Sequence, residues 1–389
     1  MHFDFDQVIE RRGTGSAKFD FAERNGYPAD VLPLWVADMD FQAPPCVIEA
    51  LHKRVEHGIF GYTDLMDGYF AAVERWFRER FHWQLQKEWL VTTPGVVFAL
   101  SAAVRVMTQP GDGILVQTPV YYPFYRVIRN NGRRIVENPL VYHDGKYTVD
   151  FEDLEKKIRE EDVKLLILCS PHNPICRVWT LEELQKLGGI CKKYGVQVIA
   201  DEIHCDFALP GYTHTPFLVA CPDMADRTLV CTAPSKTFNL AGMQVSNIFI
   251  PGEELRNAYR EEMDRISYHS PGCLGITACQ AAYEGGGEWL EACKAYMLEN
   301  LCYVRQFLAE HLPGIRLVEP EGTYFAWLDC TGLGLSGEEL DDLIVHKAGL
   351  WLDSGAIFGD AARQFQRVVL ACPRATLQQA MENLKKALD

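Results

Sequence analysis

The stretch from Lys164 to Glu202, KLLILCSPHNPICRVWTLEELQKLGGICKKYGVQVIADE, holds two short apolar runs on either side of an amphipathic segment. The runs KLLILCSP and VQVIADE are continuously apolar rather than alternating, which is typical of strands buried on both faces of a sheet. Between them, Thr180 and Glu183 predict a capping box, and apolar side chains recur at helical spacing up to Gly195, a typical helix end. This strand–helix–strand unit predicts an α/β fold with a parallel or mostly parallel sheet.

The same reading extends to both sides of this unit. Further buried strands are predicted for GILVQTP (113–119) and TLVCTAP (228–234). Towards the C-terminus, GTYFAWLDC (322–330) and QRVVLACP (366–373) predict strands, and residues 375–389 predict an amphipathic helix with Thr376 and Gln379 as cap and partner. A helical stretch over residues 284–312 links the two parts. We therefore expect a smaller α+β unit at the C-terminal end, with the first 45 residues packed against it.

Composition and charge exclude several classes of protein. The chain has 389 residues, of which 48% are hydrophobic and 23% charged, as in a globular protein with a large core. The net charge of −15 argues against nucleic acid or an anionic membrane as partner. The N-terminal segment lacks the apolar core of a signal peptide, no apolar run is long enough to span a bilayer, and a cytoplasmic location is expected. The 13 cysteines are scattered without zinc-site spacing, so we expect reduced core thiols and no metal.

Polar side chains follow three of the predicted strands at the points where they end. Asn173 follows the first strand of the opening stretch, Asp201 and His204 close the second, and Lys236 follows TLVCTAP. Each residue alone has an ordinary explanation, since asparagine before proline is common in turns and a carboxylate at a strand end often acts as a cap. Ligands of open α/β sheets bind beyond the carboxyl ends of the strands, where these residues would meet.

This set of side chains suits pyridoxal 5′-phosphate (PLP). PLP needs a lysine amine for covalent attachment and an acidic group at its pyridine nitrogen, so that the ring can accept electrons. Lys236 is the candidate amine, Asp201 the candidate partner of the nitrogen, and Asn173 a candidate donor to the phenolic oxygen. Tyr121, in TPVYYPFY, could stack on the ring, although a core position would also explain it.

A site for the phosphate group can also be identified. In TTPGVVFAL, Gly95 precedes an apolar helical run, so the N–H groups of Gly95, Val96 and Val97 would point from a helix N-terminus. A plain turn into a core helix is the alternative reading of this segment. The hydroxyls of Thr232 and Ser235, which lie beside the candidate lysine, could add further donors.

Taken in order, these motifs resemble a known family. LPLWVADMDF, FGYT, TPGVV, TPVYYPFY, SPHNP, ADEIH, SKTFNLAG and ACPR are similar to those of fold-type I PLP enzymes of the aminotransferase class I/II superfamily. The resemblance is strongest to the MalY/PatB group of cystathionine β-lyases and cystalysin-like carbon–sulfur lyases, and it covers the whole chain.

The resemblance implies an architecture and a set of roles. It implies a large PLP-binding domain over residues 48–285, with a mostly parallel seven-stranded sheet between helices, and a small α+β domain formed by residues 1–47 and 286–389. It assigns Lys236 to PLP and His204 to the cofactor site. It also implies that Arg374 binds the substrate carboxylate, and that Tyr62 reaches the phosphate in the other subunit of a homodimer.

Three positions depart from the wider superfamily or from the lyase group. His204 stands where aminotransferases usually have a tyrosine, and the lyase group also has a histidine at this position. Gln244 replaces an arginine that usually pairs with the phosphate, which leaves neutral donors for that task. Cys176 replaces a turn glycine of the lyase group, which leaves open whether the turn needs a positive φ.

The resemblance to the lyase group favours β-elimination. Lys236 would remove the Cα proton of an S-substituted L-cysteine such as cystathionine or cystine, and loss of the thiolate would lead to pyruvate and ammonia. Transamination with the same cofactor remains an alternative, because it shares most of these motifs. A PLP-binding protein that acts through a regulatory partner is a second alternative.

Overall fold

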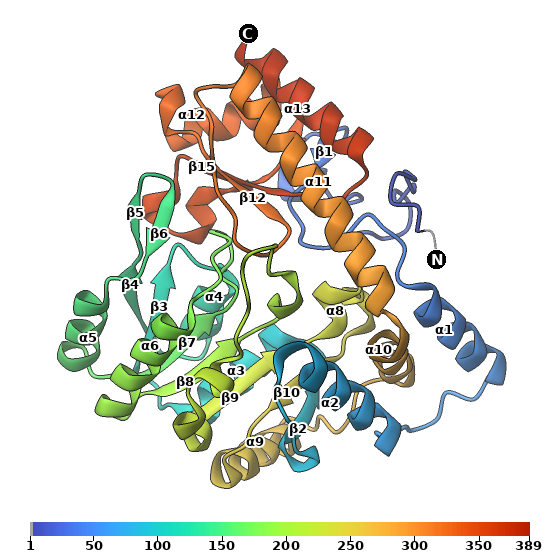
Figure 1. Ribbon diagram of the computed structural model, residues 1–389, viewed down its shortest axis with the longest axis vertical. Coiled ribbons are helices and arrows are strands. Elements are labelled where there is room, and N and C mark those ends of the chain that lie inside the picture. The colour runs from blue at the N-terminus through green and yellow to red at the C-terminus, as the bar shows by residue number, and fades with distance from the viewer. Residues whose placement is uncertain (1–2) are drawn as a thin grey trace.

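The computed structural model, which describes residues 3–389, is built around a seven-stranded sheet (Figure 1). Its central strands are buried along nearly their whole length, with Lys164 near the start of one of them exposed, which is why their sequences are almost continuously apolar. All neighbouring strands are parallel except for one, which is antiparallel to both of its neighbours. In sheet order the strands are β2 (Leu90–Thr93), β10 (Ser246–Phe249, the antiparallel one), β9 (Thr228–Thr232), β8 (Gln197–Asp201), β7 (Val163–Cys169), β3 (Gly113–Thr118) and β4 (Arg134–Pro139).

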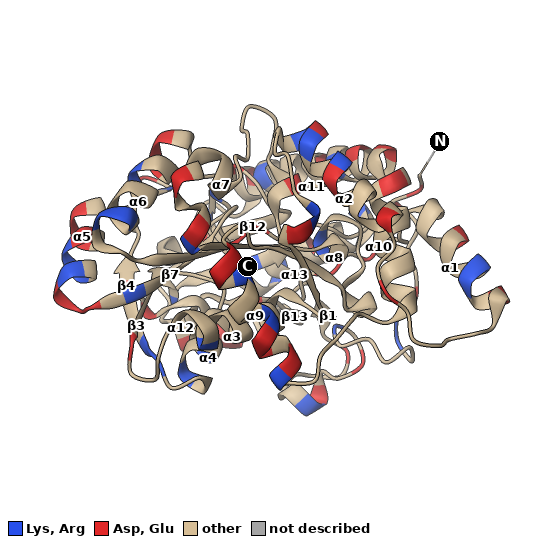
Figure 2. Cartoon of the chain, turned by 90° about the horizontal axis from the view of Figure 1, so that it is seen from below, with Lys and Arg blue, Asp and Glu red and all other residues tan. Residues whose placement is uncertain are grey.

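Helices cover both faces of this sheet, as the view in Figure 2 shows. One face carries α3 (Val96–Met107), α4 (Pro123–Asn130) and α9 (Glu253–Arg265), whose apolar side chains form one core cluster. The other face carries α2 (Asp67–Phe81), α5 (Phe151–Glu160), α6 (Leu181–Tyr194), α7 (Phe217–Ala220) and α10 (Cys273–Gly285). In this view, acidic and basic residues are interspersed along the outer helices. The mostly parallel seven-stranded sheet and the α/β class expected from the sequence are confirmed.

A second, four-stranded antiparallel sheet lies at the other end of the molecule (Figure 1). The long helix α11 (Gly287–His311) runs towards it from the end of α10, as the helical pattern over residues 284–312 predicted. In sheet order its strands are β11 (Arg316–Val318), β12 (Phe325–Asp329), β15 (Phe365–Val369) and β14 (Asp353–Ser354), with α12 (Gly337–Asp342) and α13 (Arg374–Leu388) packed nearby. A separate antiparallel hairpin, β5 (Val141–His143) and β6 (Lys146–Thr148), follows β4 in the chain.

The N-terminal segment packs against the C-terminal part, as expected. Strand β1 (Leu32–Pro33) pairs in parallel with β13 (Leu350–Trp351), and the indole of Trp351 is stacked between the rings of Tyr27 and Trp35. The segment then leads into α1 (Pro45–His57), which packs on α10. The domain boundaries at residues 47 and 285 remain a prediction, and Met1 and His2 lie outside the described residues.

Local signals in the sequence were reliable at one helix and misleading at another. Helix α6 has the predicted capping box of Thr180 and Glu183 and ends at Gly195, which has a left-handed φ of 71°. Helix α13, in contrast, begins at Arg374 directly after Pro373, so the predicted cap at Thr376 was wrong. Pro373 is the N-cap residue, with an extended ψ of 144° and no side-chain group that could cap the helix by a hydrogen bond. All 13 cysteines are free, and ten of them are buried. Among the described residues, no helix has the length and apolarity needed to cross a membrane.

Candidate active site

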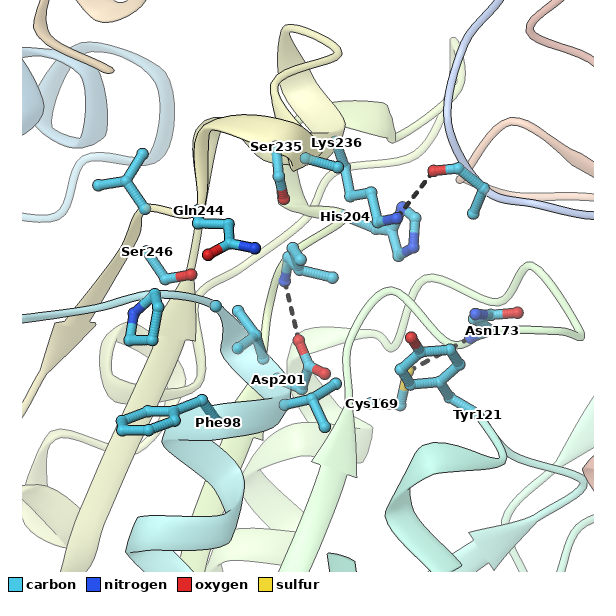
Figure 3. A pocket seen from close by; sticks show the side chains of 18 residues that line it. Phe98, Tyr121, Cys169, Asn173, Asp201, His204, Ser235, Lys236, Gln244 and Ser246 are labelled. Atoms are coloured by element: carbon cyan, nitrogen blue, oxygen red, sulfur yellow. Dashed lines mark hydrogen bonds between the residues drawn. The ribbon is translucent and has the colours of Figure 1, made fainter. Parts of the chain in front are cut away.

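A cavity of about 450 Å³ opens beyond the carboxyl ends of β7, β8 and β9 (Figure 3). The parallel strands bring their C-terminal residues to one edge of the sheet, so side chains distant in sequence meet there. Most of the predicted site residues line this cavity: Gly95, Val96, Val97, Tyr121, Asn173, Asp201, His204, Ser235 and Lys236.

Lys236 projects into the cavity from α8 (Pro234–Thr237), the short helix that follows β9. Its Nζ donates a hydrogen bond of 2.7 Å to the carbonyl oxygen of Ala37 in the N-terminal segment. Removal from water lowers the pKa of this amine to about 8, and the nearby carboxylate of Asp38 partly opposes this shift. The shift raises the fraction of the amine that is neutral near neutral pH, and it is this neutral form that can act as a nucleophile or base.

Asp201 ends β8 and faces the cavity from below the amine (Figure 3). One carboxylate oxygen accepts a hydrogen bond of 3.2 Å from the backbone N–H of Ile203. Burial raises the pKa of Asp201 to about 7, against the opposing effects of that hydrogen bond and of Lys236. A buried carboxyl group without a cationic partner in direct contact is suited to receive a protonated nitrogen from a ligand.

One end of the cavity is rich in neutral donors suited to an anion. Gly95 precedes α3, so the first N–H groups of that helix face the cavity, and a side chain at Gly95 would meet no atom within 4 Å. Ser235, Gln244 and Ser246 line the same end in Figure 3. Among the described residues, the buried hydroxyl of Ser246 has no hydrogen-bond partner. Gln244 is the residue that stands in place of the usual arginine, whereas Ser246 lies in a buried strand and gives no local signal in the sequence.

Tyr121, Asn173 and His204 lie around the other parts of the cavity. The side-chain oxygen of Asn173 accepts a hydrogen bond of 2.8 Å from Nη1 of Arg367, which leaves its amide hydrogens free for a ligand. Burial, together with the charges of Lys236 and Arg367, holds the pKa of His204 well below its ordinary value. His204 is therefore a neutral ring, packed edge-on against Tyr324 and Phe325.

Three predicted residues do not line this cavity. The hydroxyl of Thr232 donates to the carbonyl oxygen of Asn247 at 2.9 Å, within the sheet. Tyr62 is fully exposed, in the segment between α1 and α2. Arg374 lies in the first turn of α13, where its Nε donates to the side-chain oxygen of Asn300 at 2.6 Å.

The arginine beside the cavity is Arg367, which the sequence analysis did not select. It lies in β15, is almost fully buried and contacts Asn173, the backbone carbonyl of Trp35 and the carboxylate of Asp353. Its Nε has no hydrogen-bond partner within residues 3–389. A charged residue inside an otherwise apolar strand, QRVVLACP, was the available signal, because buried arginines are rarely placed without a partner to bind.

Cys176 occupies a turn that does need a positive φ. Its φ is 60°, and its carbonyl oxygen accepts the backbone N–H groups of Glu321 and Gly322. The buried thiol donates to the carbonyl of Pro174 at 3.1 Å. The turn thus keeps the left-handed geometry that glycine adopts without strain, with the chain held there by hydrogen bonds from the loop before β12.

Comparisons with known proteins agree with this architecture. Residues 29–384 match the family described as aminotransferase class I and II. The chain is 43% identical to the cystathionine β-lyase PatB of Bacillus subtilis (strain 168), over 99% of this chain and all of that one. It is 33% identical to the protein MalY of Escherichia coli (strain K12), over 99% of both.

Among solved structures, cystalysin from Treponema denticola, which contains a pyridoxal 5′-phosphate cofactor, superimposes with a TM-score of 0.96. The two chains are 40% identical, and the match covers all of this chain and 99% of the cystalysin chain. The strand-end cavity, the mostly parallel sheet and these full-length matches lead to one conclusion: the chain belongs to the aminotransferase class I and II family, in the branch that contains PatB, MalY and cystalysin.

Proposed function

We propose that the protein is a PLP-dependent carbon–sulfur β-lyase acting on L-amino acids that carry sulfur on Cβ, such as cystathionine or cystine. The observation that carries the proposal is the meeting of the Lys236 amine, the Asp201 carboxyl and the start of α3 in one cavity. The names of its relatives, cystathionine β-lyase and cystalysin, support elimination over transamination.

The residues of the cavity fit PLP. Lys236 would bind its aldehyde carbon, and Asp201 would hold the proton of its pyridine nitrogen. The phosphate would meet the α3 N-terminus and the hydroxyls of Ser235 and Ser246, and the unpartnered Ser246 hydroxyl and open space at Gly95 support this placement. When bound, PLP withdraws electrons from the substrate Cα and so makes its proton removable.

Two further groups complete the proposed cofactor site. Tyr121 would supply a ring face, and the free amide hydrogens of Asn173 would reach the phenolic oxygen. His204, held neutral, would add a ring without a charge that competes with the amine.

Arg367, rather than Arg374, is proposed to bind the substrate carboxylate. Its planar guanidinium is fixed by Asn173 and Asp353, and its unpartnered Nε can donate to a carboxylate oxygen. This contact between the Arg367 guanidinium and the carboxylate would orient the substrate so that its Cα lies within reach of Lys236. The side chain of Arg374 is already engaged with Asn300.

Lys236 is proposed to move the reacting proton. With its pKa near 8, the released amine is able to take the Cα proton, and the carbonyl of Ala37 can accept a hydrogen bond from the ammonium that results. The thiolate leaves from Cβ with the electron pair of the C–S bond. The 2-aminoacrylate formed in this way reacts with water to give pyruvate and ammonia.

A homodimer would complete the site. Val97 lines the cavity yet is 40% exposed, so the cavity opens to the outer surface. Apolar side chains are exposed in the segment before α2: Ile59, Phe60, Tyr62 and Met66. An apolar segment of this kind is typical of an interface, and Tyr62 would then reach the phosphate of the neighbouring subunit.

The reaction type is tested by product analysis. With L-cystathionine or S-methyl-L-cysteine and no 2-oxo acid, purified protein should release pyruvate, ammonia and a thiol in equal amounts. Coupled assays for pyruvate and thiol measure this directly. Turnover that requires a 2-oxo acid and yields a new amino acid would make the protein an aminotransferase. Binding of PLP without either reaction would favour a regulatory role.

The two arginines give a matched test of carboxylate binding. Arg367→Lys should raise KM and lower kcat/KM by about 10- to 100-fold, since an ammonium cannot keep the contacts with Asn173 and Asp353 and also reproduce the fixed Nε donor of the planar guanidinium. Arg374→Lys should change kcat/KM by less than about threefold, because its contacts lie on α11. The reverse ranking in steady-state kinetics would return the role to Arg374.

Subunit mixing tests the proposed role of Tyr62. Tyr62→Ala and Lys236→Ala should each be impaired alone, but reassociated mixtures should regain about a quarter of wild-type activity, because half of the dimers would contain one intact site. Pyruvate release after co-refolding measures this recovery. No recovery, with dimers demonstrated by light scattering, would place Tyr62 in the site of its own chain.

A further inference from the structure

The segment from Ala37 to Phe41 lies between the cavity, which Ala37 lines, and the N-terminal residues Ile9 and Arg11, which line a second pocket together with residues 38–41. The carbonyl oxygen of Ala37 accepts hydrogen bonds from the Lys236 amine at 2.7 Å and from the Tyr324 hydroxyl at 3.0 Å. The position of this carbonyl therefore determines where the free amine rests (Figure 3).

The carboxylates of Asp38 and Asp40, which follow Ala37, form ion pairs with two cationic side chains of the N-terminal segment. Arg11 contacts Asp38 at 2.6 Å and Asp40 at 2.6 Å. Lys18, whose side chain has no exposed surface, contacts Asp40 at 2.8 Å and Asp38 at 3.7 Å. Four charges in such a sheltered cluster are less screened than a surface ion pair, so they hold the segment strongly.

The same segment is tied to the loop that carries Lys236. The side-chain amide of Asn239 donates to the carbonyls of Met39 and Phe41, both at 2.9 Å, and accepts from the Met39 N–H at 3.0 Å. Asn239 adopts a φ of 56° only three residues after Lys236. The segment from Ala37 to Phe41 and the loop that carries Lys236 are therefore held together by these hydrogen bonds.

We infer that Asp38 is a positioning residue: held by Arg11 and Lys18, it fixes the Ala37 carbonyl on the Lys236 amine and supplies a negative charge that steadies the proton on that amine. This inference rests on the proposed role of Lys236 in cofactor binding. It gives the N-terminal segment a function in the chemistry of the site, in addition to its packing against the C-terminal part.

The charges around the amine set the direction of the expected effects. Asp38 raises the pKa of Lys236, so its loss should make the amine easier to deprotonate. Loss of Arg11 should make the Lys236 amine harder to deprotonate, because the negative charges of Asp38 and Asp40 are then less neutralised. The other groups that face Lys236 or share its carbonyl partner are Asp201, Arg367, His204, Tyr121 and Tyr324.

The test measures how fast the full-length, cofactor-free protein takes up PLP at different pH values, followed by the absorbance of the lysine-linked cofactor. Only the neutral amine attacks the aldehyde, so the midpoint of the rate profile reports the Lys236 amine. Asp38→Asn should move this midpoint to lower pH, and Arg11→Gln to higher pH, each by about 0.5 to 1 pH unit. The double variant should return close to wild type.

Asp223 and Lys192 provide matched controls, because they form an exposed ion pair at 2.6 Å away from the cavity. Asp223→Asn and Lys192→Gln should leave the midpoint unchanged. If the cluster had a purely structural role, the midpoints of Asp38→Asn and Arg11→Gln would move in the same direction or would not move. Either result would overturn the inference. The Arg11 variant decides alone if Asp38→Asn does not fold, because an unchanged or lower midpoint there contradicts the inference.

Wild-type protein separates this inference from the proposed function. If it takes up no PLP, the proposed function fails. If uptake is normal but the two variants do not move in opposite directions, only the inference about Asp38 fails.

Discussion

Lys236→Ala is expected to lower pyruvate release by about 10⁴-fold and to abolish covalent attachment of the cofactor. Both effects have one cause, since the same amine at the end of β9 would bind the cofactor and remove the Cα proton. Borohydride reduction followed by peptide mapping, together with the coupled pyruvate assay, measures the two losses separately.

Lys192→Ala is the control for this substitution, because Lys192 is half exposed and pairs with Asp223 on the surface. It should retain wild-type turnover and the reducible link. A reduced cofactor that maps to a lysine other than Lys236 in the wild-type protein would remove Lys236 from the proposed mechanism.

Asp201→Asn should have the second largest effect, a loss of about 10²-fold or more in kcat. A neutral amide cannot hold the pyridine nitrogen in its protonated form, so the substrate Cα proton becomes harder to remove. Steady-state kinetics with saturating PLP measure this loss. Near-normal turnover of the variant would show that the carboxylate at the end of β8 has no part in the chemistry.

The stability of the cofactor-free protein shows whether this loss comes from the chemistry or from the fold. Burial raises the pKa of Asp201 from 3.8 to about 7, so the folded chain binds this proton more tightly than the unfolded chain. The contribution to stability is complete below about pH 4 and is lost as the pH rises through about 7. Asparagine does not ionise, so the melting temperature of Asp201→Asn relative to wild type should increase between about pH 5 and pH 8.

A damaged fold would lower both the activity and the melting temperature of Asp201→Asn. A lower kcat together with a melting temperature that rises relative to wild type therefore indicates a loss in the chemistry. Asp206→Asn is a suitable comparison, because Asp206 is also buried but accepts hydrogen bonds from Trp76 and Thr237. Burial raises the pKa of Asp206 as well, so its comparison is made at one pH: at pH 7 the variant should melt below wild type, since an amide leaves one of these donors without its acceptor.

The candidate site shows how far local reasoning reaches. Asn173, Asp201 and Lys236 could be identified from the sequence because each directly follows or closes a continuous apolar strand, and parallel strands bring such ends together. Gly95 to Val97 were found for a similar reason, because a glycine before an apolar helical run predicts an anion-binding helix start. In each case the informative pattern is contiguous along the chain.

Arg367 and Arg374 show where that reasoning ends. The two residues are seven positions apart and both lie near the junction of β15 and α13, yet one is buried against Asn173 and the other faces Asn300 on α11. The direction of a side chain at a strand–helix junction depends on the register of β15 against β12 and β14. That register is fixed by packing across the whole small sheet, which motif matching does not represent.

The sequence by itself determined the fold class and most of the residues that meet in the strand-end cavity, because buried strands, capping boxes and helix starts are set by residues close to each other in the chain. Only the tertiary structure decided which arginine approaches the cavity, that Thr232 is engaged within the sheet, and that Arg11 and Lys18 clamp the segment bearing Asp38. These contacts join residues separated by up to hundreds of positions. Their geometry is therefore set by how the elements pack on one another, rather than by any local preference of the chain.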